Sequence, residues 1–170
     1  MEILRSVVSN QYDCDLQRYC RENQDDLLGE RELVDLVLTL FQRLQMHHPH
    51  AHKLLCRLSC YRYQDGDTIN EAGVLCFVSD LPERQRKPTI QVLRDVSLLE
   101  SEAGRYWLHP VIRQEAIDIL RQDTADWHFA NITAAQFWSD SIPSVRSTQD
   151  ALSAMQAFYH YLQIQYSGQN

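Results

Sequence analysis

The sequence predicts a mainly α-helical fold in three parts: a helical segment over residues 1–45, a winged-helix domain with one β-hairpin over residues 46–123, and an antiparallel helix pair over residues 124–170. Three observations predict it. The 170 residues contain only five glycines and five prolines, which favours long helices. Apolar residues recur at steps of three and four in most segments, and this period gives way once, at residues 98–109, to a strand-like stretch.

The first part contains the clearest helix, over residues 30–45. Acidic residues stand in its first turn and Arg43 in its last, as the helix dipole favours. Two shorter helices are expected before it, over residues 2–9 and 13–22. The apolar side chains of the main helix form one stripe: Leu33, Leu36, Val37, Leu40, Phe41 and Leu44.

The next helices are those of the winged-helix domain. Pro49 suits the start of a helix. Thr68 and Glu71 are three residues apart and predict a capping box for the second helix. Pro88 falls early in the third, where it bends the first turn or delays the start. The three helices are expected over residues 50–63, 70–79 and 83–97.

A β-hairpin is expected at residues 98–109. Leu98-Leu99-Glu100 and the run from Arg105 to His109 flank a polar turn that contains Gly104. A helix over residues 111–121 follows. Three helices, a hairpin and a fourth helix are the element order of a winged helix, a relative of the helix-turn-helix.

The last part predicts two helices, over residues 126–141 and 148–166. Each combines alanines at close-packing spacing with bulky aromatic residues, which suits an antiparallel pair of the kind stacked in helical repeats. Such a pair leaves an apolar flank uncovered where a next pair would stack. The alanines are Ala130, Ala134 and Ala135 on the first helix and Ala151, Ala154 and Ala157 on the second.

Composition limits the classes of partner and compartment. The net charge of −7 argues against a general nucleic-acid binder, because attraction to phosphate needs a basic face. Five cysteines without framework spacing, and an N-terminus without a basic-then-apolar signal, favour reduced thiols and a cytoplasmic location. The longest apolar run is far shorter than the roughly 20 residues that span a bilayer, so no membrane partner is expected.

Metal and catalytic sites are not expected. His48 and His52, like Cys56 and Cys60, are four apart on a helix, but His48 and Cys60 would be about 18 Å apart along it, too far for one zinc ion. Solvated histidines and core cysteines are the favoured interpretation. The sequence contains no phosphate loop, nucleophile elbow or H-E-x-x-H motif, so no catalytic residue is assigned and the chain is not expected to be an enzyme.

A winged helix also makes DNA binding an alternative. Phosphate contacts would fall to basic residues of the third helix and the wing. Acidic residues interleave with them, so a mixed solvated surface is favoured, but a DNA-binding regulator remains the alternative hypothesis. The basic residues are Arg84, Arg86, Lys87, Arg94 and Arg105.

Several phrases resemble the middle of the STAND/NB-ARC regulatory NTPases, in particular cyanobacterial ones that end in tetratricopeptide repeats. They are "NQDDLLGERELVDLV", "LLCRLSCYRYQD", "GVLCFVSDLPERQR", "VLRDVSLLE", "YWLHPVIRQEAI" and "ALSAMQAFYHYL", and the resemblance covers nearly the whole chain. It implies the family's helical domain, winged-helix domain and entry to the repeats, without the P-loop domain that precedes them. The chain is then expected to begin downstream of an ATP site.

The resemblance singles out His109. In the family, a Met-His-Asp type motif of the winged-helix domain brings its histidine to the β-phosphate of bound ADP. Leu108-His109-Pro110 occupies that place, with Pro110 instead of the acid. From the residues alone, His109 is expected to bond locally at the bend before the helix. The resemblance implies a nucleotide-sensing role that needs a P-loop partner, so ADP or ATP is expected only when such a domain is supplied.

The expected function is that of a non-catalytic regulatory and protein-interaction module, which couples the nucleotide state of a P-loop domain to a sensor. The expected partners are a P-loop ATPase domain, a ligand of the repeat domain, or a second copy of the chain. A stand-alone nucleotide-binding protein is a third hypothesis, which calorimetry with Mg-ADP would separate from the others.

Overall fold

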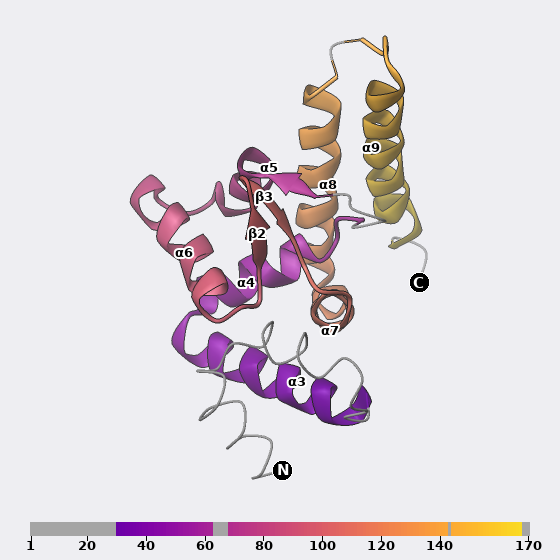
Figure 1. Ribbon diagram of the computed structural model, residues 1–170. Helices are drawn as coiled ribbons and strands as arrows, with labels where there is room; N and C mark the ends of the chain where they lie inside the picture. The colour runs from indigo at the N-terminus through magenta and orange to yellow at the C-terminus, as the bar shows by residue number, and fades with distance from the viewer. Residues whose placement is uncertain (1–29, 63–67, 143, 168–170) are drawn as a thin grey trace.

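A computed structural model describes residues 30–62, 68–142 and 144–167, with side chains over 35–62, 68–142 and 144–165. The described chain is mainly helical and carries one small antiparallel sheet (Figure 1). The helices predicted over residues 2–9 and 13–22 lie outside the described residues. Within the described ranges, no helix has both the length and the apolar character needed to cross a membrane.

The middle of the chain has the predicted winged-helix arrangement. The sheet order is β1-β3-β2, so the last strand lies between the other two. A helix precedes β1, two α-helices and a short 3-10 turn separate β1 from the hairpin, and a helix follows. The elements are α4 (Pro49–Leu58), β1 (Ile69–Asn70), α5 (Glu71–Leu75), the 3-10 turn η1 (Cys76–Val78), α6 (Glu83–Asp95), β2 (Glu100–Glu102), β3 (Arg105–Trp107) and α7 (Pro110–Gln122).

Strand β1 corrects the prediction of a helix capped by Thr68. Ile69 pairs with Tyr106 and Asn70 with Arg105. Asn70 caps α5 instead, because its Oδ1 accepts from the Gly73 N–H at 2.9 Å. A strand of two residues is too short to show an alternating sequence pattern. The spacing of Thr68 and Glu71 was therefore read as a helix cap, and that prediction was wrong. Helix α4 also ends at Leu58, before the predicted residue 63.

The predicted hairpin is confirmed, with shorter strands. Its turn residues Ala103 and Gly104 have φ values of 48° and 76°. Two successive positive φ angles are those of the two-residue turn that matches strand twist. Trp107 lies opposite Glu100 and donates from Nε1 to its Oε2 at 2.8 Å.

Helix α4 lies at the centre of a continuous core. Leu54, Leu55 and Leu58 are fully buried, and α3 (Glu30–His47) packs against α4 through its apolar stripe. From the opposite direction, Trp127 and Ala130 of α8 (Thr124–Asp140) belong to the same buried cluster. The winged-helix elements and the following helix therefore share one core.

The C-terminal helices form the predicted antiparallel pair. Helix α9 (Thr148–Ser167) lies beside α8 along most of its length (Figure 1). Ala130, Ala134 and Ala135 are fully buried, and Ala157 nearly so, which lets the two backbones approach closely.

Candidate functional site

His109 is the N-cap of α7. Its Nδ1 accepts a hydrogen bond from the Val111 N–H at 3.3 Å, and Pro110 occupies the first helical position. This is the local bond that the residues alone predict. A neutral imidazole that accepts through Nδ1 carries its proton on Nε2, so the second nitrogen is a donor. A donor is the group that the resemblance requires for contact with a phosphate.

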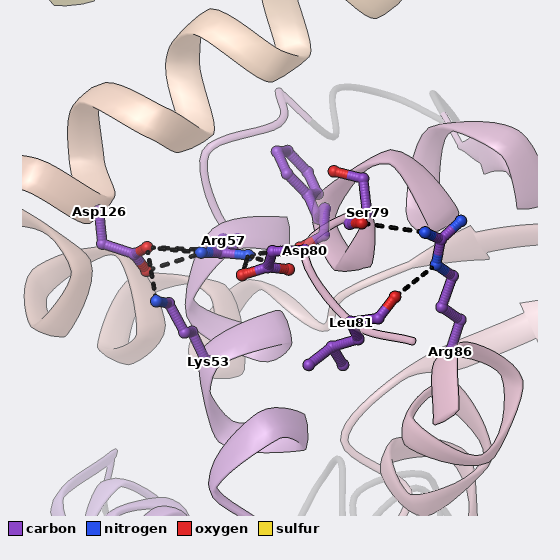
Figure 2. A network of polar contacts seen from close by, with 8 residues as sticks. Lys53, Arg57, Ser79, Asp80, Leu81, Arg86 and Asp126 are labelled. Atoms are coloured by element: carbon purple, nitrogen blue, oxygen red, sulfur yellow. Dashed lines mark hydrogen bonds and ion pairs between the residues drawn. The ribbon is translucent and has the colours of Figure 1, made fainter. Parts of the chain in front are cut away.

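The basic residues of the DNA-binding hypothesis divide into two groups. Arg86 and Arg105 bond to the domain itself: Arg86 donates to the Leu81 and Ser79 carbonyls at 3.0 and 2.9 Å, and Arg105 donates to Thr68 Oγ1 and O at 2.7 Å each. Figure 2 shows that the Arg86 side chain on α6 is hydrogen-bonded to the turn before that helix. Both guanidinium groups therefore hold loops in place.

The other three cations lie on an exposed face of α6. Arg84, Lys87 and Arg94 are three and seven residues apart, which places them on one side of the helix, and all are exposed. The Lys87 ammonium is 3.4 Å from Glu71 Oε1, and Arg94 donates to Gln91 Oε1 at 3.2 Å. The stripe is short and partly paired with neighbours.

Arg57 forms a buried ionic network that sequence reasoning missed. The residue is 4% exposed. Its Nε and Nη2 donate to Asp126 at 3.0 and 2.9 Å, and its Nη1 donates to the Phe77 carbonyl at 2.6 Å and to Asp80 at 3.2 Å (Figure 2). The guanidinium also lies 4.1 Å from the centre of the Phe129 ring. We call Arg57, Asp80 and Asp126 the arginine clamp.

The arginine clamp joins three elements that are distant in sequence. Arg57 comes from α4, Asp80 from the turn before α6, and Asp126 from the first turn of α8. Lys53 adds a second cation, with its Nζ 3.3 Å from Asp126 Oδ1. The clamp therefore fixes the start of the helix pair to the winged-helix core. The available signal was a single arginine inside the otherwise apolar run of α4.

The exposed face of α9 is apolar and uncharged. Leu152, Met155, Phe158 and Tyr161, at steps of three residues, are 50%, 63%, 63% and 48% exposed. From Ala151 to the end of the helix the sequence contains no Asp, Glu, Lys or Arg. The opposite side of α9 packs on α8. We call the four exposed residues the α9 face.

Comparison of the chain with family models, with curated proteins and with solved structures found no match. The geometry of the chain itself is therefore the basis for a functional assignment.

A buried polar pair lies between α8 and α9. His160 is fully buried, and its Nδ1 is 3.0 Å from Asn131 Oδ1. Burial, together with the positive charges of Arg62 and Arg113, lowers the pKa of His160 to about 3. The imidazole is therefore neutral at ordinary pH, and Nδ1–H donates to the amide oxygen.

The cysteines of α4 and the following turn are core residues, as predicted. Cys56 and Cys60 are both buried. Burial raises the pKa of the Cys56 thiol to about 12, and it also raises the pKa of the Cys60 thiol. A protonated thiol is a poor nucleophile and a poor metal ligand. His47, His48 and His50 are exposed, and the described residues include no group of three His, Cys, Asp or Glu placed to hold a metal ion.

Proposed function

We propose that the chain is a non-catalytic interaction module in which a winged-helix body presents α9 to a protein partner. The observation that carries this proposal is the uncharged, exposed α9 face. Single exposed apolar residues are ordinary, but four at regular spacing on one helix form a continuous surface. The centres of protein interfaces have this composition: aromatic residues and methionine are enriched, and Lys, Glu and Asp are depleted.

The chemistry of the α9 face selects the class of partner. Nucleic acid requires cations, and α9 carries none in its exposed stretch. Helices that lie on membranes use Lys and Arg on their polar side, which α9 also lacks. The surface that fits best is an apolar helical face of a protein, as in stacked helix pairs.

The arginine clamp and His109 support a role in transmission. The clamp connects α8 to the winged-helix core, so a displacement of that core carries the helix pair with it. At another part of the domain, His109 offers an Nε2 donor for the phosphate contact that the resemblance implies. We infer that a separate P-loop ATPase domain docks at His109, and that its nucleotide state reaches the α9 face through this body.

The α9 face is tested with the chain itself as the probe, because a second copy supplies an apolar helical surface. Sedimentation equilibrium over a range of concentrations is expected to show self-association that Phe158→Glu weakens about tenfold or more, since a charge buried in an apolar contact costs about 1.4 kcal/mol or more. Val145→Glu is the matched control, because Val145 is 62% exposed but lies before α9. A chain that stays monomeric at millimolar concentration contradicts the proposed docking surface.

Calorimetry tests the nucleotide part separately. The chain alone is expected to give no binding heat with Mg-ADP, because one imidazole donor without a phosphate loop supplies little affinity. Heat that His109→Ala abolishes would instead establish a stand-alone nucleotide-binding protein.

The exposed cations of α6 favour DNA binding as a second candidate. Arg84, Lys87 and Arg94 lie on one side of the helix that enters DNA in this fold class. Fluorescence anisotropy with duplex DNA would show binding that weakens with salt and is lost when all three residues are changed to glutamine. Absence of binding at low salt eliminates this candidate.

A further inference from the structure

One side of α9 packs on α8 through a narrow seam. Ser153, Ala157 and His160 are 8%, 6% and 0% exposed, and His160 Nδ1 lies 3.0 Å from Asn131 Oδ1 of α8. These residues of α9 are four and three positions apart, which is the spacing of the core positions in two helices that run side by side. A seam with this spacing contacts one neighbouring helix.

A second seam with the same spacing lies on the opposite side of α9. We call Ala151, Met155, Phe158 and Leu162, at steps of four, three and four residues, the outer seam. Its members stand two positions before those of the first seam, which places them about 200° around the helix. Met155 and Phe158 are each 63% exposed, and α9 lies at the edge of the molecule (Figure 1). The outer seam therefore has the spacing for a neighbouring helix, and the described part of the chain leaves its two central side chains largely uncovered.

The lack of charge along α9 indicates what kind of helix the outer seam contacts. In paired helices, charged residues beside the seam decide which partner is accepted. From Ala151 to Ser167, α9 contains no Asp, Glu, Lys or Arg, so it offers no charge that a different protein could match. The fit must then come from the spacing and the volumes of the side chains.

A second copy of α9 supplies both the spacing and the volumes. Steps of four, three and four residues read the same in both directions, so an antiparallel copy meets the outer seam in register. Ala151 then lies opposite Leu162 of the second copy, and Met155 lies opposite Phe158. Small residues meet large ones at the ends, and a thioether meets an aromatic ring at the centre. A parallel copy would instead place two phenylalanines in one layer and two alanines in another, which leaves a void.

The charge of the chain also favours the antiparallel direction. The loop between α8 and α9 projects away from the winged-helix elements (Figure 1). An antiparallel pair therefore keeps the two winged-helix bodies at opposite ends of the contact. Since each chain has a net charge of −7, this separation reduces the repulsion between the copies.

We propose that α9 pairs with α9 of a second copy in antiparallel direction through the outer seam, so that two α8–α9 pairs form a four-helix bundle. This inference rests on the proposed docking role of the α9 face and names the partner. The exposed side chains offer on the order of 400–500 Å² per copy, about half of what a standard interface buries on each partner. The dimer is therefore weak, with a dissociation constant on the order of 100 µM.

Isotope-filtered NMR on a millimolar mixture of ¹³C-labelled and unlabelled chain tests the direction of the pair. A nuclear Overhauser effect is expected between the methyl groups of Ala151 and Leu162 of different copies. Within one helix these residues are about 16 Å apart along the axis, and a parallel pair keeps them equally far apart. The signal therefore requires the antiparallel contact.

Exchanging the volumes of one layer tests the packing by sedimentation equilibrium. Ala151→Leu and Leu162→Ala are each expected to weaken dimerisation about fivefold, the first by crowding and the second by leaving a void. The double variant restores one small and one large residue in each end layer, so its dissociation constant is expected within about twofold of that of the unmodified chain. Ala125→Leu is the matched control, because Ala125 is exposed on α8 and lies outside the seam.

The outcomes separate this inference from the proposed function. A dimer that Phe158→Glu weakens but that gives no signal between Ala151 and Leu162 would overturn the antiparallel pairing and leave the docking role of α9 intact. Additive losses in the double variant would overturn it as well. A chain that stays monomeric at millimolar concentration would contradict both. The NMR measurement uses the unmodified chain, so it decides the question even if a variant does not fold.

Discussion

Arg57 shows how one buried charge is stabilised in an otherwise apolar core. Burial removes the hydration of its guanidinium, which strongly disfavours the folded state unless partners replace the water. Two carboxylates, one backbone carbonyl and the face of Phe129 provide those partners. The arrangement is therefore more sensitive to the loss of one member than an exposed ion pair would be.

Arg57→Leu is expected to lower the free energy of unfolding by about 3–5 kcal/mol, because it leaves the 11% exposed Asp126 carboxylate without its main partner. Lys53→Met is the control: Lys53 also contacts Asp126, but its side chain is 49% exposed, so a loss of about 1 kcal/mol or less is expected. Urea denaturation followed by circular dichroism measures both. Equal losses in the two variants would show that Arg57 is not the centre of the network.

His160 predicts a pH dependence of stability. Its pKa falls from 6.5 to about 3 in the folded chain, so the unfolded imidazole binds a proton at pH values where the folded one does not. The stabilising contribution is complete above pH 6.5 and is lost as the pH falls from 6.5 towards 3, by up to about 1.4 kcal/mol per pH unit. His160→Gln removes the titrating group, so its stability should fall less steeply with acid than that of the unmodified chain.

The measurement is urea unfolding at a series of pH values. His50→Gln, at an exposed histidine, should keep the dependence of the unmodified chain. Parallel curves for His160→Gln and the unmodified chain would mean that His160 does not contribute.

At the level of elements, the spacing of apolar residues predicted the long helices but not the short strand β1. Residues 30–45 and 148–166 give α3 and α9 nearly complete, because a stripe over several turns fixes both type and extent. Strand β1 has only two residues, and its existence depends on β3, some 35 residues later in the sequence. Pairing over that distance leaves no mark on the local sequence, so Thr68 and Asn70 were assigned to the wrong structure.

Helix α5 packs so closely against its neighbours at Gly73 that there is no room for a larger side chain. A Cβ at this position would overlap Ile69 Cγ2 and lie 2.9 Å from Phe137 Cζ. Alanine inside a helix normally stabilises by about 1 kcal/mol relative to glycine. Here the crowding reverses the sign, and Gly73→Ala is expected to destabilise by about 1–3 kcal/mol in thermal or urea unfolding.

The double variant Gly73→Ala with Ile69→Ala supplies the control, because it removes the overlapping methyl group. Its loss should be smaller than the sum of the two single losses. Additive losses would indicate that the contact with Ile69 does not limit this position.

At the level of the whole molecule, the surfaces were easier to predict than the contacts that join the parts. The apolar flank of the helix pair follows from the composition of α9. The arginine clamp does not, because Arg57, Asp80 and Asp126 come together only after three elements have packed. The bond of His109 to Val111 is local and was expected, whereas the phosphate contact proposed for His109 would depend on another polypeptide.

The continuous core predicts that the winged-helix elements and the helix pair unfold together. Trp127 and Ala130 of α8 share a buried cluster with α4, and the clamp adds an ionic connection at the same end of the helix. Two single-tryptophan variants report on the two parts: one keeps Trp107 in the wing, the other Trp138 on α8. Their fluorescence is expected to change at the same urea midpoint and with the same slope, as one cooperative transition requires. If the two variants have the same overall stability but the Trp138 variant shows a lower urea midpoint than the Trp107 variant, the helix pair opens independently of the winged-helix core. Transmission from the winged-helix core to the α9 face as one rigid body would then fail, because the connection would break before the core does.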